Sequence, residues 1–119
     1  GGKTLYPWGN DEKNLENYCN INFSNNDVVC LSNYANGKNM WGIKNLFGNC
    51  WYWTTTNFYP FDGFTIDALY DTFSYPFFYF RTVVKGCSWA TNSDLIHSNY
   101  RNAQEKEKVF HFTGIRLVR

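Results

Sequence analysis

Apolar and polar positions along this 119-residue chain are spaced in several different ways, and each spacing predicts a different structure. In residues 49–55, tryptophan and tyrosine alternate with smaller neighbours, which is typical of a strand with one buried face. Residues 79–89 predict one or two further strands, and 97–101 predict a short one. Ile115 and Leu117 alternate with Arg116 and Val118, which predicts a closing strand at 115–118.

Two long segments lack this alternation. In residues 10–42 asparagine is very frequent, glycine recurs and apolar periodicity is weak, which predicts an irregular excursion with one short helical turn at 12–18. Residues 57–76 contain two prolines and one glycine among many aromatic residues. This composition predicts an ordered loop that is packed by its own rings.

Composition narrows the picture further. The length fits a single domain. Aromatic residues form 21% of the chain, so we expect a core of rings in which Trp51, Trp53 and Trp89 pack two sheets together. The net charge is +1 and the basic residues are dispersed, so the sequence predicts no basic patch that would bind nucleic acid. No apolar run is long enough to span a membrane. The expected partners are therefore small molecules or proteins.

Three blocks carry the most specific motifs. Residues 48–54 read Gly-Asn-Cys-Trp-Tyr-Trp-Thr, residues 85–91 read Lys-Gly-Cys-Ser-Trp-Ala-Thr, and residues 114–119 read Gly-Ile-Arg-Leu-Val-Arg. With the opening block 1–10, their order resembles the formylglycine-generating enzyme and sulfatase-modifying factor superfamily. The resemblance implies an α+β, C-type-lectin-like fold with short antiparallel strands, long irregular loops and little helix. It also implies that residues 1–119 are the C-terminal portion of one such domain.

Within that superfamily, the run from residue 58 to residue 102 is most similar to the ergothioneine-type and ovothiol-type sulfoxide synthases. These non-haem iron enzymes use oxygen to join a thiol to a histidine derivative. The resemblance implies a cytoplasmic enzyme with a small-molecule thiol and a histidine-derived substrate. It also identifies Tyr70 as a catalytic acid or hydrogen-bond donor beside the iron, although Phe73 competes for the same matching position.

Iron ligands are not expected within this chain. His97 and His111 are its only histidines, and neither has a carboxylate at ligand spacing, as a facial triad requires. Any iron(II) would therefore be held by ligands outside these residues. The copper-binding cysteines of the formylglycine-generating branch correspond to Thr91 and to a position near Ile96, so sulfatase activation is not expected.

Substrate-side positions depart from the resembled enzymes. Asn102 is retained as a substrate-binding residue, whereas Ala103, Gln104 and Lys108 replace tryptophan, aspartate and a basic residue. Alanine removes an aromatic face that can hold a quaternary ammonium, and glutamine removes a charge. Lys108 keeps its positive charge but cannot form the bidentate hydrogen bonds that arginine makes to a carboxylate. We therefore expect a changed substrate if activity is retained.

Calcium binding is a further trait that the resemblance implies. The matching donors are the side chain of Asn45, the backbone carbonyls of Gly48 and Cys50, and Tyr52 at a position where the family carries glutamate. Calcium prefers charged carboxylate oxygens, and a neutral phenol supplies none. The sequence thus predicts a calcium site that is weakened or lost.

Two readings of function stay open. One is a sulfoxide synthase domain, and the other is a non-catalytic binding module on the same fold that recognises a ligand or a partner protein, or is completed by one. Four cysteines allow three disulfide connectivities, whereas the resemblance favours reduced thiols. We expect Cys50 and Cys87 to be buried as small apolar residues.

Overall fold

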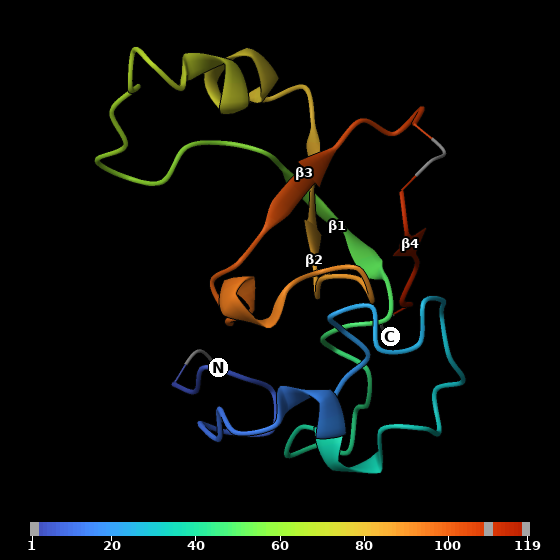
Figure 1. The fold of residues 1–119 in the computed structure, drawn as a ribbon. Helices are drawn as coiled ribbons and strands as arrows, with labels where there is room; N and C mark the ends of the chain where they lie inside the picture. Colours follow the sequence, from blue (N-terminus) through green and yellow to red (C-terminus); the bar gives the residue numbers. More distant parts are fainter. Residues whose placement is uncertain (1–2, 109–110, 118–119) are drawn as a thin grey trace.

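The computed structural model describes residues 3–108 and 111–117 (Figure 1). Regular structure in these ranges is limited to four short strands and five single-turn 3₁₀ helices, so the prediction of little helix is confirmed. The helical part of the predicted α+β class is reduced to these turns, which are η1 (Leu15–Asn17), η2 (Ala35–Gly37), η3 (Asp71–Phe73), η4 (Tyr75–Phe77) and η5 (Ser93–Leu95). None of these helices is long and apolar enough to cross a bilayer, in the ranges described.

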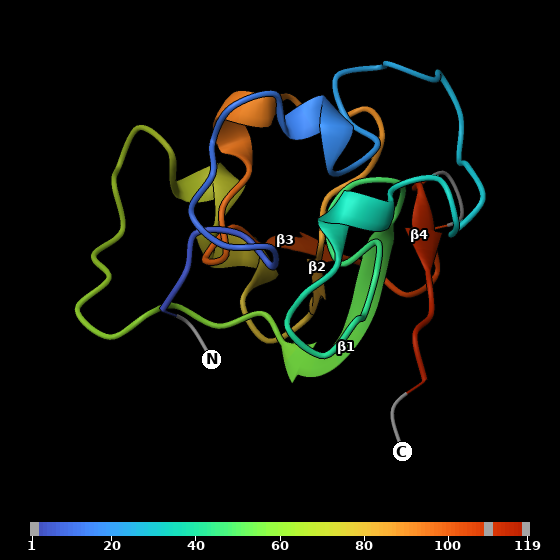
Figure 2. The ribbon, with the colours of Figure 1, turned by 90° about the horizontal axis from the view of Figure 1, so that it is seen from below.

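The strands form one mixed sheet in the order β3, β2, β1, β4 (Figures 1 and 2). Their bounds are β1 (Trp51–Asn57), β2 (Thr82–Lys85), β3 (Asn102–Gln104) and β4 (Thr113–Gly114). β2 pairs antiparallel with both β1 and β3, but β4 pairs parallel with β1. The prediction of antiparallel strands is therefore wrong for β4. After β3 the chain crosses to the opposite edge of the sheet and enters β4 in the direction of β1.

Two predicted strands are displaced. No strand forms at 97–101, because the carbonyls of Ser98 and Tyr100 accept hydrogen bonds from the Lys85 ammonium, at 2.9 and 2.6 Å, and Tyr100 N–H closes a turn onto His97. The closing strand lies at β4 rather than at 115–118, of which residue 118 falls outside the described residues. The strands predicted at 49–55 and 79–89 are confirmed as β1 and as the single strand β2.

The core lies where the first fifty residues and the segment after β2 fold against the sheet (Figure 2). Its buried residues are Tyr6, Leu15, Cys19, Ile21, Phe47, Trp51, Val84, Cys87 and Ile96. Trp53 packs at its edge, whereas Trp89 pairs with Phe112 at a ring separation of 4.6 Å. The expectation that tryptophans join two sheets is wrong, because the described residues contain a single sheet and loops cover it.

Buried asparagines hold these covering loops together. Asn49, 5% exposed, accepts hydrogen bonds from Val29 N–H (2.8 Å) and the Asn20 amide (3.2 Å), and donates to Val29 O (3.2 Å). Asn20 is fully buried and also donates to Asp27 O at 2.8 Å. Irregular backbone cannot satisfy its own polar groups as a helix or sheet does. Amide side chains satisfy them here.

The segment between β1 and β2 behaves differently, and we call residues 58–80 the aromatic loop. It extends away from the rest of the molecule in Figure 1. Phe78 is buried, 5.1 Å from the ring of Phe58 and 5.5 Å from that of Phe64. Many large side chains of the loop are instead exposed, and they include Tyr59, Phe61, Phe64, Ile66, Leu69, Tyr70, Phe73, Tyr75, Tyr79 and Phe80. The prediction that the loop is packed by its own rings is therefore wrong for most of them.

Candidate functional site

The aromatic loop and β3 meet at one end of the sheet. Backbone hydrogen bonds from Phe58 N–H to Arg81 O (2.7 Å) and from Tyr79 N–H to Phe58 O (2.6 Å) close the base of the loop. Directly beside this base, Thr82 of β2 is paired with Gln104 of β3. The two segments that carry the predicted catalytic and substrate-binding residues therefore lie at the same end of the sheet. We call this place, where the base of the aromatic loop adjoins β3, their shared rim.

Tyr70 lies on the aromatic loop, immediately before η3, and is 62% exposed. Its ring centroid is 6.1 Å from that of Phe73, so the two residues that compete for the catalytic position are neighbours in one turn. Within the described ranges no hydrogen bond engages the Tyr70 hydroxyl or joins Tyr70 to β3. The Tyr70 phenol is therefore exposed, and among the described residues it makes no hydrogen bond to the predicted substrate-binding residues of β3.

The substrate-side residues lie on and after β3. Asn102 is exposed, with its side-chain oxygen accepting from Ala103 N–H at 2.7 Å, and Gln104 is half-buried. Lys108 places its ammonium 3.3 Å from Glu105 Oε1. That carboxylate also accepts a 2.9 Å hydrogen bond from the Arg81 guanidinium. The charge of Lys108 is therefore partly neutralised within the chain.

Sequence reasoning missed this Arg81–Glu105 pair, which ties the base of the aromatic loop to the end of β3. The Arg81 guanidinium lies 3.4 Å from the centroid of the Phe77 ring as well. Hydrogen bonds from Arg81 and then Lys108 lower the pKa of the Glu105 carboxyl. Opposite charges two dozen positions apart carry no local spacing signal, so only the fold brings them together.

The predicted calcium donors lie in the turn before β1 and at the start of β1. Asn45 is 1% exposed and donates to Leu31 O at 3.2 Å, while its side-chain oxygen is buried without a partner. Gly48 has φ +74° and donates its N–H to Gly86 O at 2.7 Å. A side chain on Gly48 would collide with the carbonyl of Asn20, so this turn requires glycine.

A guanidinium already lies beside these donors. Arg116 donates to Lys44 O (2.9 Å) and Asn45 O (3.4 Å), and its Cζ lies 5.0 Å from the centroid of the Tyr52 ring. Burial raises the pKa of the Tyr52 phenol, the Cys50 thiol raises it further, and Arg116 opposes both. A fixed cation with no carboxylate is a poor environment for a hard divalent ion. The donor set does not fit calcium, and we derive no step through that ion.

The described residues also offer no iron site. His97 is exposed and His111 is half-buried with Nε2 unpartnered. Across residues 3–108 and 111–117, no three His, Cys, Asp or Glu side chains gather as metal ligands. The donors present here do not fit iron.

All four cysteines are unpaired thiols. Cys87 is 1% exposed, as predicted, and burial raises its pKa to about 12. Cys50 is only half-buried, with its pKa raised by burial. A thiol that stays protonated is a poor nucleophile and metal ligand, so Cys87 acts as a small core residue.

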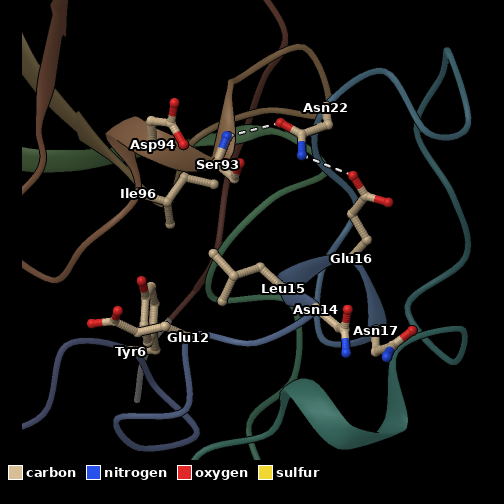
Figure 3. Close-up of a pocket in the computed structure, with 10 residues that line it drawn as sticks. All are labelled: Tyr6, Glu12, Asn14, Leu15, Glu16, Asn17, Asn22, Ser93, Asp94 and Ile96. Carbon is tan, nitrogen blue, oxygen red and sulfur yellow. Dashed lines mark hydrogen bonds between the residues drawn. The ribbon is translucent and has the colours of Figure 1, made fainter.

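A hollow of about 600 Å³ lies between η1 and η5, and none of the predicted site residues lines it (Figure 3). Leu15 and Ile96 form its apolar wall, and the Asn22 side chain joins its two sides by accepting from Ser93 N–H and donating to Glu16, both at 2.8 Å. Its other lining residues are Tyr6, Glu12, Asn14, Asn17 and Asp94. None of these was predicted as a site residue.

Comparison with known proteins gives a consistent result across the chain. The family model described as sulfatase-modifying factor enzyme 1-like domain matches residues 1–119. Proteins named hercynine oxygenase are similar over 99% of the chain, with 30% identity for Mycobacterium tuberculosis, 27% for Mycolicibacterium smegmatis and 29% for Mycolicibacterium thermoresistibile. The chain spans 27–28% of the length of these relatives.

Proposed function

Because this chain belongs to the sulfatase-modifying factor enzyme 1-like domain family, we propose that it is part of a sulfoxide synthase of the hercynine-oxygenase kind. In this proposal the enzyme joins a small-molecule thiol to a histidine-derived substrate with oxygen, and it works in the cytoplasm. The similarity to hercynine oxygenases over 99% of the chain carries the proposal. The shared rim of the aromatic loop and β3 supports it, since substrate residues must lie close to a catalytic group.

Tyr70 is the proton donor in this proposal. An exposed phenol with no hydrogen-bond partner among the described residues is free to donate to a reacting oxygen. Iron(II), held by ligands outside residues 1–119, would supply oxygen activation when bound. The residues of this chain would orient the substrate and hold the proton at the Tyr70 hydroxyl.

The amide groups of Asn102 and Gln104 would bind the substrate by hydrogen bonds along β3. Ala103 between them is 6% exposed, so its methyl group packs inward and offers no aromatic face to a ligand. Lys108, already paired with Glu105, would contribute only part of its charge. We therefore propose that the substrate pair differs in its charged groups from the pair used by enzymes with tryptophan and aspartate here.

The test is an assay of the full-length protein with iron(II), oxygen, a thiol and a histidine betaine, followed by mass spectrometry for a sulfoxide. Tyr70→Phe is expected to lower kcat by about 10²-fold or more, the usual contribution of a proton donor. Tyr75→Phe is the matched control, because Tyr75 is equally exposed, at 61% against 62%, on the next turn of the same loop. No sulfoxide and no oxygen uptake with the unmodified protein would overturn the proposal.

A second function is favoured by one observation. The exposed rings of the aromatic loop suit a non-catalytic module that binds a partner protein. Metal analysis of the full-length protein separates the two readings. Stoichiometric iron supports the enzyme, whereas purified protein that takes up no iron under reducing conditions supports the binding module.

A further inference from the structure

Lys85, the last residue of β2, is a half-buried cation with no acidic partner in the part of the chain that the structure describes. Its ammonium donates hydrogen bonds to the carbonyls of Ser98 (2.9 Å) and Tyr100 (2.6 Å). Burial lowers the pKa of Lys85, and the neighbouring Arg101 guanidinium lowers it further. Two like charges are therefore held close together in a partly desolvated place, which is unfavourable without a compensating anion.

Arg101 is fixed in that place by the aromatic loop. Its Nη2 donates to Tyr59 O at 2.7 Å, and its Cζ lies 3.8 Å from the centroid of the Phe61 ring and 4.9 Å from that of Phe58. Among the described residues, the guanidinium makes this hydrogen bond alone, and its other N–H groups are free to donate. Arg101 is thus pre-oriented, with little side-chain freedom left to lose on binding a ligand.

The two cations line one hollow of about 510 Å³, together with Phe61, Ser98 and Asn99. None of the described residues that line it is acidic. The salt bridges found in the described ranges join Arg81 and Lys108 to Glu105, and neither involves Lys85 or Arg101. The hydroxyl of Ser98 and the side-chain amide of Asn99 make no hydrogen bond in the same ranges. Every polar side chain around the hollow therefore has a donor to offer.

We propose that Lys85, Ser98, Asn99 and Arg101 form a binding site for the carboxylate group of a small molecule. A carboxylate accepts from an arginine fork and an ammonium at once, and neutral amide and hydroxyl donors complete its shell. This site goes beyond the proposed reaction, because it requires neither the metal nor Tyr70. It lies next to Asn102, so an anion held here would be adjacent to the rim of the aromatic loop and β3.

Asn99→Asp tests the proposal by supplying the missing carboxylate from the chain itself. Asn99 is exposed and its side chain forms no hydrogen bond among the described residues, so the change leaves other contacts intact. Thermal unfolding of the full-length protein would be followed in chloride and in sodium acetate at the same ionic strength. In the unmodified protein, acetate at about ten times its Kd is expected to raise Tm by roughly 3 °C.

The Asn99→Asp protein is expected to have a raised Tm already in chloride and to lose the response to acetate. Asn33→Asp is the control for charge alone, since Asn33 is exposed and lies outside the hollow, and it should keep the full response. An unchanged acetate response in Asn99→Asp, or none in the unmodified protein, would overturn the site. A larger shift with inorganic phosphate than with acetate would overturn the assignment to carboxylates.

Discussion

The loop-built core and the aromatic loop use the same kinds of residue to opposite effect. In the core, irregular segments contribute the buried rings of Tyr6 and Phe47, and fully buried Asn20 is hydrogen-bonded on several sides. In the aromatic loop, the chain between two strands of the same sheet leaves Phe73 and other rings exposed.

Polar satisfaction explains the contrast. Irregular backbone can be buried only where side chains accept and donate for it, and asparagines do so in the core. The aromatic loop has no such network and is anchored instead at its base and through Arg101. The core is therefore expected to depend on single polar atoms, and the loop to tolerate the loss of large apolar groups.

Asn49→Leu should have the largest effect. It removes the partner of Val29 N–H and Val29 O and of the Asn20 amide, and leaves these groups buried and unsatisfied. We expect a loss of about 4 kcal/mol in the free energy of unfolding, measured by chemical denaturation. Asn33→Leu, at an exposed position, should stay within about 0.5 kcal/mol. Equal losses for both variants would show that the asparagine network does not hold the core.

Ile21→Ala should follow. The Ile21 side chain is fully buried in the core, so the substitution leaves a cavity that costs about 3 kcal/mol of unfolding free energy. Leu69→Ala removes a similar volume from the aromatic loop, where Leu69 is 85% exposed, and should cost far less. A loss at Leu69 as large as at Ile21 would mean that the loop is covered in the full-length protein.

Arg101→Met should act locally. It removes one hydrogen bond to Tyr59 O and the contacts of the guanidinium with Phe61 and Phe58, together worth about 1–2 kcal/mol. Hydrogen exchange followed by mass spectrometry should show faster exchange in the aromatic loop and unchanged exchange in the core. Lys106→Met, at an exposed position, is the control. Unchanged exchange at residues 59–61 would show that Arg101 does not anchor the loop.

Phe73→Ser combined with Phe80→Ser should have the smallest effect on stability. The two side chains are 77% and 85% exposed, so the unfolding free energy should change by less than about 0.5 kcal/mol. Light scattering should show less self-association, because apolar surface has been removed. A loss above about 2 kcal/mol would reveal that another part of the protein covers these rings.

Local patterns predicted β1, where tryptophan and tyrosine alternate with smaller residues, and β2, which is a short run rich in β-branched residues. They failed at 97–101, where the carbonyls of Ser98 and Tyr100 turn toward Lys85. The sequence near residues 97–101 gives no sign that the Lys85 ammonium will lie beside it. The parallel entry of β4 was missed for the same reason, since pairing direction depends on the path of the whole chain.

The site was predictable by residue type but not by arrangement. Tyr70 and Gln104 were identified from the resemblance, and the structure puts their segments on one rim without joining them. The Arg116 guanidinium beside Asn45 was not anticipated, because its block reads as a strand motif. The backbone is left-handed at Asn45 and Asn49, a conformation that asparagine tolerates. The abundance of asparagine predicts irregular backbone of this kind but not the positions at which it occurs.

The pairing of β4 with β1 has a consequence for how the protein is made. Trp51 donates its backbone N–H to Phe112 O at 2.7 Å, so β1 is completed by a segment that is synthesised much later than β1 itself. Contacts of such long sequence separation form slowly. Until translation has passed Gly114, one edge of β1 stays open, with unpaired backbone groups that invite pairing with a neighbouring nascent chain.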